Sequence, residues 1–197
     1  MKPLLLIAIT ILAVGCGEKN ESITETKPEL NIVPDEKLII REGIWYLKGA
    51  DTPFTGKVYK LHPNGQKKGE ATAKDGKRDG IAMTWYENGQ KEFEEYYKDG
   101  KLEGPSNAWY ENGQKKGELN AKDGKIEGLF VEWHENGQKK RETTFKIGKR
   151  VGLWLEWYDN GQMKKEINYK DGEEVEGSAK YWNRKGEPVD SLEEAQK

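Results

Sequence analysis

Short stretches of the chain alternate apolar and polar residues, which is the pattern of a strand with one buried face. Between Gly80 and Tyr86 the apolar positions are Ile81, Met83 and Trp85. The alternation returns at Leu129, Val131 and Trp133, and at Leu153, Leu155 and Trp157. The last position of the pattern is a tryptophan column made of Trp85, Trp109, Trp133, Trp157 and Trp182. We interpret this column as the core of a sheet, or as a ladder that a partner contacts.

The polar residues between these stretches repeat at a fixed period. The tripeptide Asn-Gly-Gln begins at Asn64, Asn88, Asn112, Asn136 and Asn160, each 24 residues after the last. A second glycine column, usually Asp-Gly, runs from Gly76 to Gly172, and a third begins at Gly80. Asn-Gly and Asp-Gly adopt positive φ at low cost and close hairpins. The sequence therefore predicts an all-β, elongated antiparallel β-meander of tandem 24-residue hairpin repeats over residues 37–190.

The register of the Asn-Gly hairpin decides which residues share a face. A two-residue loop pairs Met83 with Glu94, whereas a three-residue loop, Glu87-Asn88-Gly89, pairs Met83 with Phe93. The choice of loop also decides on which face a column of glutamates lies. This column consists of Glu70, Glu94, Glu118, Glu142 and Glu166. We predict the three-residue loop, which places the glutamates away from the tryptophans on a solvated face.

A stripe of aromatic and histidine side chains is expected on that opposite face. It consists of Tyr86, Tyr110, His134 and Tyr158, with Trp154 joining in a single repeat. The two histidines, His62 and His134, replace tyrosine in the repeat, so we interpret them as rim residues without an acid–base role. The glutamate column has lysine two positions away in most repeats, which favours a salt-bridged surface over the paired carboxylates of a glycosidase.

The composition narrows the chemistry further. The 33 basic and 35 acidic residues are interspersed and give a formal net charge of -2, so no nucleic-acid-binding patch is expected. The glycines do not form a phosphate-binding loop, and no serine lies in a nucleophile-elbow pattern. The single cysteine excludes a cysteine-based metal site. We expect no enzymatic activity, no cofactor and no metal.

The N-terminus has the anatomy of an export signal. Residues 4–14 carry no charge and are followed by Gly15-Cys16, and a run of this length is shorter than the roughly 20 residues of a spanning helix. Ala13-Val14-Gly15-Cys16 resembles the bacterial lipobox. We predict a signal peptide over 1–15, a lipidated Cys16, a flexible tether over 16–36 and a polar tail over 191–197 with at most a helical turn. Acylated Cys16 would hold the protein to a membrane of the cell envelope, the outer rather than the inner.

The repeat units resemble a known family. Trp-Tyr-Glu-Asn-Gly-Gln-Lys, at Trp85 and at Trp109, and Tyr-Lys-Asp-Gly-Lys, at Tyr97, resemble the MORN-repeat-variant family over about residues 41–189. These bacterial repeat proteins are often labelled as the antitoxin component of a toxin–antitoxin system. The resemblance implies an elongated meander of hairpins.

Two functions are compatible with these features. The first is a non-catalytic, envelope-anchored binding or scaffold module for a protein or glycan partner. The alternative is an antitoxin or immunity protein that neutralises a cognate toxin by direct contact.

Overall fold

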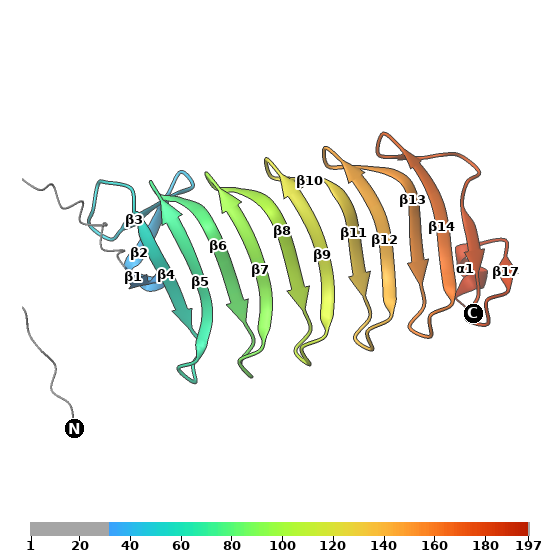
Figure 1. The fold of residues 1–197 in the computed structure, drawn as a ribbon, viewed down its shortest axis with the longest axis horizontal. Helices are drawn as coiled ribbons and strands as arrows, with labels where there is room; N and C mark the ends of the chain where they lie inside the picture. Colours follow the sequence, from blue (N-terminus) through green and yellow to red (C-terminus); the bar gives the residue numbers. More distant parts are fainter. Residues whose placement is uncertain (1–31, 197) are drawn as a thin grey trace, which may run out of the picture.

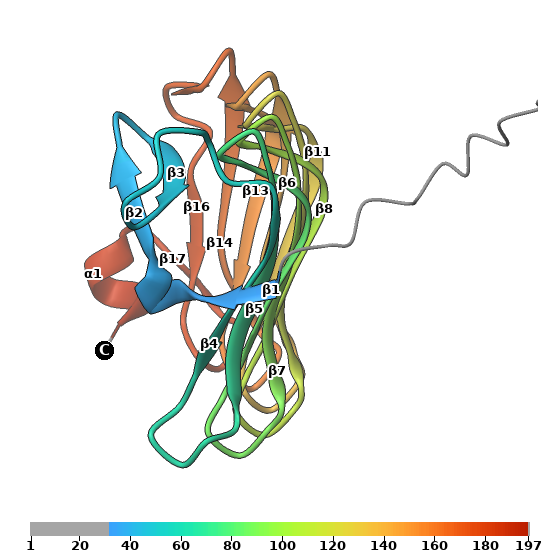
Figure 2. The ribbon, with the colours of Figure 1, turned by 90° about the vertical axis from the view of Figure 1, so that its left-hand side faces the viewer.

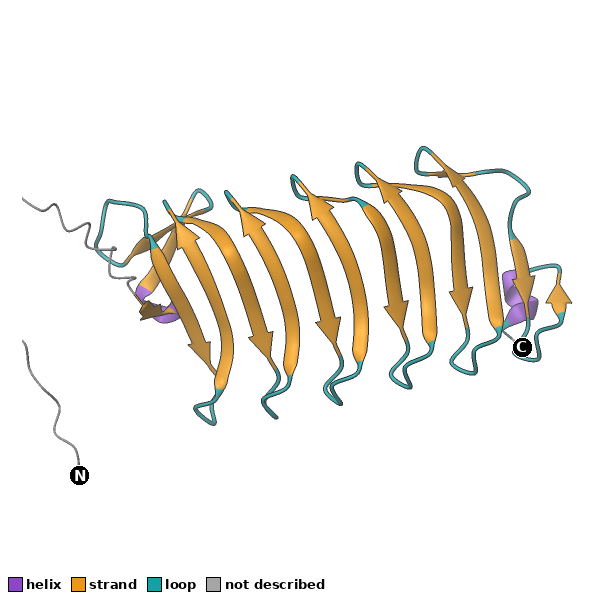
Figure 3. Ribbon diagram, viewed as in Figure 1, coloured by secondary structure: helices purple, strands orange, loops and turns teal. Residues whose placement is uncertain are grey.

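The computed structural model describes residues 32–196, most of which form one elongated, bowed sheet (Figure 1; Figure 3). The sheet has 15 strands, and the neighbours along it follow the order of the sequence from β4 onward. The predicted all-β antiparallel meander is confirmed. The predicted signal peptide, Cys16 and most of the predicted tether lie outside the described residues.

Each 24-residue unit supplies one hairpin of the sheet. The hairpins are β4 (Gly56–Leu61) with β5 (Lys67–Lys74), β6 (Lys77–Trp85) with β7 (Lys91–Lys98), β8 (Lys101–Trp109) with β9 (Lys115–Lys122), β11 (Gly128–Trp133) with β12 (Lys139–Lys146), β13 (Lys149–Trp157) with β14 (Met163–Lys170), and β16 (Lys180–Trp182) with β17 (Pro188–Val189). The short strands β10 (Lys125–Ile126) and β15 (Glu173–Glu174) extend the pairing of β9 and β14.

Two kinds of turn join the strands, as the glycine columns predict. The Asp-Gly turns have two residues with positive φ, for example Asp99 at 49° and Gly100 at 83°, which is the geometry of a type I′ hairpin. The Asn-Gly turns have three residues: the Tyr86 amide donates to the Gln90 carbonyl at 2.9 Å, and Gly89 has a φ of 82°. The predicted three-residue loop is confirmed.

The face that this loop implied for the glutamates was wrong. Trp85 pairs with Lys91, but Thr84 then pairs with Phe93 and Met83 with Glu94, because one residue of β7 is left over in a β-bulge. The odd-length loop alone would move the glutamates to the opposite face, and the one extra residue in the bulge moves them back. The same shift follows the Asn-Gly turn in the other repeat hairpins of the main sheet that carry a bulge. The glutamate column therefore lies on the tryptophan face.

The third glycine column marks a second bulge in each unit. Glu95 pairs with Ser106 and Tyr97 with Leu102, so three residues of β8, centred on Gly104 with a φ of 100°, lie opposite Tyr96. Bulges bend the strand that carries them. Recurring along the array, they accompany the bowed profile of the sheet in Figure 2.

Small elements cover the two ends of the sheet (Figure 1) on its concave face (Figure 2). At the N-terminal end β2 (Leu38–Arg41) and β3 (Ile44–Leu47) form a separate hairpin, and Phe54, Val58 and Ala73 are buried beneath it. At the C-terminal end α1 (Leu192–Ala195) packs through its buried residue Ala195. The concave face is thus closed at its ends and open between them.

The N-terminal boundary of the ordered sheet differs from the prediction. Residues 32–36 were expected to belong to the flexible tether, but β1 (Ile32–Pro34) pairs in parallel with β4, and the 3-10 helix η1 (Asp35–Lys37) follows it. The strand forms because Val33 packs against the apolar cluster at the end of the sheet. Within the described range, no helix is long and apolar enough to cross a membrane.

Candidate functional site

The tryptophan face consists of repeated Trp–Lys–Glu groups. The ammonium group of Lys91 lies 5.2 Å from the ring centroid of Trp109 and also forms an ion pair with Glu94. Lys67, Lys115 and Lys139 repeat this arrangement over Trp85, Trp133 and Trp157. In the last unit Met163 takes the lysine position, and Glu166 pairs instead with Lys180 at 2.8 Å. In the first four units the lysine partner is thus three residues before the glutamate, not two.

The tryptophan ladder is covered by these charges but does not form a closed core. All five tryptophans are partly buried, and none is among the fully buried residues. On the same face Val131 is 3% exposed, while Leu129 and Leu153 are 52% and 50% exposed. The glutamates and lysines satisfy one another across this convex side of the sheet.

The opposite-face stripe links each unit to the next. The hydroxyl of Tyr86 donates to the carbonyl of Trp109 at 2.8 Å, and that of Tyr110 donates to Trp133 at 2.7 Å. Tyr158 contacts the Trp182 carbonyl at 3.0 Å, and His134 Nε2 lies 2.9 Å from the Trp157 carbonyl. His62 makes the same contact with Trp85, at 2.7 Å. These side chains therefore join neighbouring hairpins by hydrogen bonds. The sequence periodicity alone did not indicate this role.

Burial favours the neutral, hydrogen-bonding form of the tyrosine side chains in the stripe. Burial, with a smaller contribution from Glu92, raises the pKa of Tyr86, and burial also raises the pKa of Tyr110. A phenol with a raised pKa keeps its proton at neutral pH and remains a donor to the neighbouring carbonyl.

The asparagine of each turn adds a second link. The side-chain oxygen of Asn88 accepts from the Gln90 amide at 2.9 Å, and its amide group donates to the Glu111 carbonyl at 2.8 Å. This double role explains why asparagine recurs where several residues would satisfy the turn.

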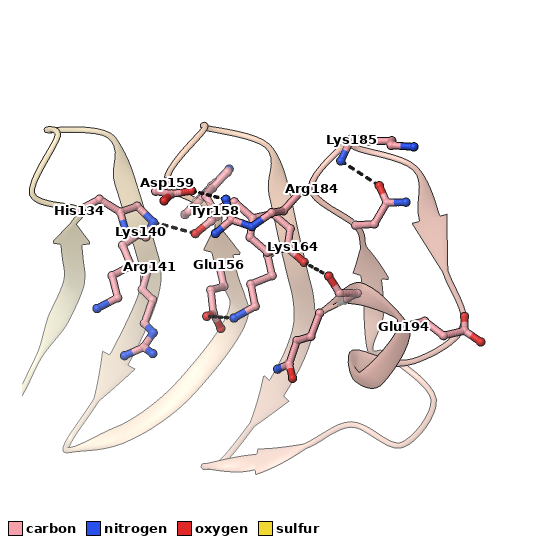
Figure 4. Close-up of a pocket in the computed structure, with 14 residues that line it drawn as sticks. His134, Lys140, Arg141, Glu156, Tyr158, Asp159, Lys164, Arg184, Lys185 and Glu194 are labelled. Carbon is pink, nitrogen blue, oxygen red and sulfur yellow. Dashed lines mark hydrogen bonds and ion pairs between the residues drawn. The ribbon is translucent and has the colours of Figure 1, made fainter.

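A cavity of about 760 Å³ lies at the C-terminal end of the concave face, between the stripe and α1 (Figure 4). Its charged lining consists of the cations Lys140, Arg141, Lys164, Arg184 and Lys185 and the carboxylates Glu156, Asp159 and Glu194. Lys164 pairs with Glu156 at 2.8 Å, and Arg184 with Asp159 at 2.6 Å. The hydrogen bond from Arg184 lowers the pKa of Asp159.

The sequence identified only part of this lining. His134 and Tyr158 belong to the predicted stripe, and the predicted Trp154 lies on the same concave face, paired with Ile167 across β13 and β14. Arg141, Arg184 and Glu194 were missed because they come from β12, the turn after β16 and α1, which only the folded chain brings together. The described residues contain no group of three or more side chains that could hold a metal ion.

Comparison with known proteins identifies the repeat. Four consecutive segments match the family model described as MORN repeat variant: residues 78–99, 102–123, 126–146 and 150–171. Each segment spans one Asn-Gly hairpin, from β6 with β7 to β13 with β14. Among curated proteins, none matches the chain.

Proposed function

From the premise that this chain contains a tandem array of MORN repeat variants, we propose that it is a binding or scaffold module without a catalytic role. Its concave face holds a protein or glycan partner at the cell envelope. The observation that supports this assignment most is the placement of β2, β3 and α1, which lie at the two ends of the sheet (Figure 1), on its concave side (Figure 2), and leave the middle open. Curved repeat arrays commonly present such a surface to their partners.

The charges on the two faces support the same assignment. On the convex side each glutamate of the column pairs with a lysine. On the concave side Glu95 accepts only the Tyr97 hydroxyl, and Arg150 lies among aromatic rings. Neither Glu95 nor Arg150 has an ion-pair partner within residues 32–196. Charges left without partners favour contact with another molecule on this side.

Site-specific photo-crosslinking from β7 tests which face binds. Phe93 and Tyr96 lie on the same strand, point to opposite faces and are 37% and 36% exposed, so they are matched probes. A crosslinker at Phe93, on the concave side, should capture a reproducible envelope partner, and the same group at Tyr96 should not. Capture from Tyr96 alone would assign binding to the convex side and contradict the proposal.

Attachment to the envelope is part of the proposal and rests on the N-terminal sequence. Cys16 directly follows an export-type apolar run, and two or more acyl chains are enough for stable membrane anchoring. A palmitate analogue should label the wild-type protein and not the Cys16→Ser variant. Persistent labelling and membrane association of that variant would show that Cys16 is not the anchor.

A further inference from the structure

The repeat allows each position on the concave face to be compared with its equivalents in other units. The position of Trp154 is occupied by Ala82, Ser106 and Phe130 in the preceding units. The position of Arg141 is occupied by Gly69, Phe93 and Gly117. Two neighbouring units thus depart from the earlier ones: β12 places an arginine and β13 places a tryptophan on the open side of the sheet.

Two arginines lie against Trp154. The guanidinium carbon of Arg150 is 4.5 Å from the ring centroid of Trp154, and that of Arg141 is 5.8 Å from it. Arg150 also contacts the rings of Tyr169, at 5.5 Å, and Phe145, at 6.0 Å. Stacking on aromatic rings fixes the planes of both guanidinium groups and reduces the entropy that they lose on binding a ligand.

Polar atoms in this cluster have no partner within residues 32–196. The Nε atoms of Arg141 and Arg150 are buried without an acceptor, and so is the hydroxyl of Thr143, which is 1% exposed and pairs with Trp154 in the sheet. Arg141 shares the carboxylate of Glu132 with Lys140, so two cations meet one anion. The cluster therefore has an excess of positive charge and of hydrogen-bond donors.

We propose that Arg141, Arg150 and Trp154 form a subsite for a carboxylate side chain on an acidic peptide segment of the partner. This inference rests on the proposed function. The planar guanidinium fork matches a carboxylate in geometry and charge. Arg141 also lines the adjacent cavity, where cations outnumber carboxylates, so the local field attracts an acidic segment. Beyond the subsite the concave face carries Ala82 and Ala108, which suit peptide side chains better than a sulfated or phosphorylated glycan.

Fluorescence anisotropy of the full-length protein in detergent tests the subsite. The probe is a labelled ten-residue peptide of alternating glutamate and leucine, and its control is the same peptide with glutamine in place of glutamate. We expect the glutamate peptide to bind at least about tenfold more tightly, since one charge-assisted hydrogen bond contributes on that scale. Equal binding of the two peptides would overturn carboxylate recognition.

Matched arginine variants separate the subsite from net charge. Arg78 occupies the position of Arg150 three units earlier in the array. It stacks on Tyr97 at 5.2 Å and on Trp45 at 5.5 Å, and Ala82 takes the place of Trp154. Arg150→Gln should weaken binding of the glutamate peptide about tenfold or more. Arg78→Gln removes the same charge and should change it less than about threefold, because distant charges are screened.

Folding and ligand class are controlled separately. If Arg150→Gln does not melt cooperatively, Arg150→Lys decides the matter, because it keeps the charge, loses the fork and should weaken binding as well. Equal loss of affinity for the glutamate peptide in the Arg78 and Arg150 variants would overturn the subsite.

Tighter, Arg150-dependent binding of dextran sulfate would also overturn the subsite, because it would assign the cluster to a polyanionic glycan. If the peptide does not bind while Phe93 still crosslinks a partner, the subsite is wrong and the proposed function stands; if both fail, both are wrong.

Discussion

Ile147 occupies the first position of a two-residue turn whose other copies carry aspartate. Its φ is 52°, in the left-handed region, and its side chain is 62% exposed. The equivalent residues are Asp75, Asp99, Asp123 and Asp171, all with positive φ. A β-branched side chain is strained in this conformation, and exposure means that packing does not compensate for the strain.

Replacing this isoleucine should therefore stabilise the protein. We expect Ile147→Asn to raise the free energy of unfolding by about 1 kcal/mol, since asparagine tolerates the left-handed region. The substitution leaves the backbone amide free to donate to Glu127, as it does now at 2.6 Å. A urea melt measures the change, and Asp123→Ile is the reciprocal control that should lose stability. An unchanged or lower midpoint for Ile147→Asn would show that the turn is not strained.

Hairpins are joined to one another by the tyrosine stripe, and this link should depend on pH. The pKa of Tyr86 and of Tyr110 is raised above the ordinary value of 10.0 in the folded protein, mainly by burial. The neutral phenol is thus favoured by folding. Its contribution is fully present below the unfolded pKa and is lost as pH rises through the folded pKa. The array should lose stability above about pH 10.

A double variant, Tyr86→Phe with Tyr110→Phe, isolates this contribution. At neutral pH it should be less stable by about 1 kcal/mol for each hydroxyl removed, because each donates to a neighbouring tryptophan carbonyl. Above pH 10 its stability should fall less steeply than that of the wild type, since two titrating groups are absent. Urea midpoints between pH 7 and pH 11 provide the measurement. If the urea midpoints of the wild type and the variant fall in parallel with pH, the two tyrosine hydroxyls do not cause the pH dependence of stability.

The turns of each hairpin were predictable from sequence, but the register between its strands was not. Asn-Gly and Asp-Gly carry their own conformational preference, so the loops follow from local chemistry. The bulge after the Asn-Gly turn falls on Lys68, Glu92, Lys116, Lys140 and Lys164, none of which has a backbone preference that marks it. Its position reflects the pairing of whole strands. The role of the stripe in joining hairpins depends on a carbonyl 23 residues away, which the periodicity does not indicate.

At the scale of the whole molecule, the periodicity makes length adjustable in units of one repeat. Deleting residues 112–135 joins Glu111 to Asn136 and restores the same turn, so a shorter soluble sheet should result, with lower stability because one neighbour is lost. Deleting residues 112–123 removes one strand and its turn, so every later strand would start at the wrong end of its neighbour. That variant should aggregate. Size-exclusion chromatography and thermal melts compare the two, and equal behaviour would contradict the modular architecture.

The caps and the cationic cluster are also properties of the whole fold. β1 and α1 carry weak signals in sequence, because each is held by contacts that form only when the sheet is complete. The Arg150 side chain meets Trp154 and Tyr169 across neighbouring strands, a contact that becomes visible once the register is known.

The strands run across the long axis of the sheet (Figure 1), and this has a mechanical consequence. The inter-strand hydrogen bonds lie along that axis, so a pull between the two ends loads them in series and peels one strand from the next. Such an array yields in steps, and each released unit of 24 residues adds roughly 80 Å of extended chain. A partner held on the concave face would thereby be joined to the N-terminal end of the protein through an extensible spring.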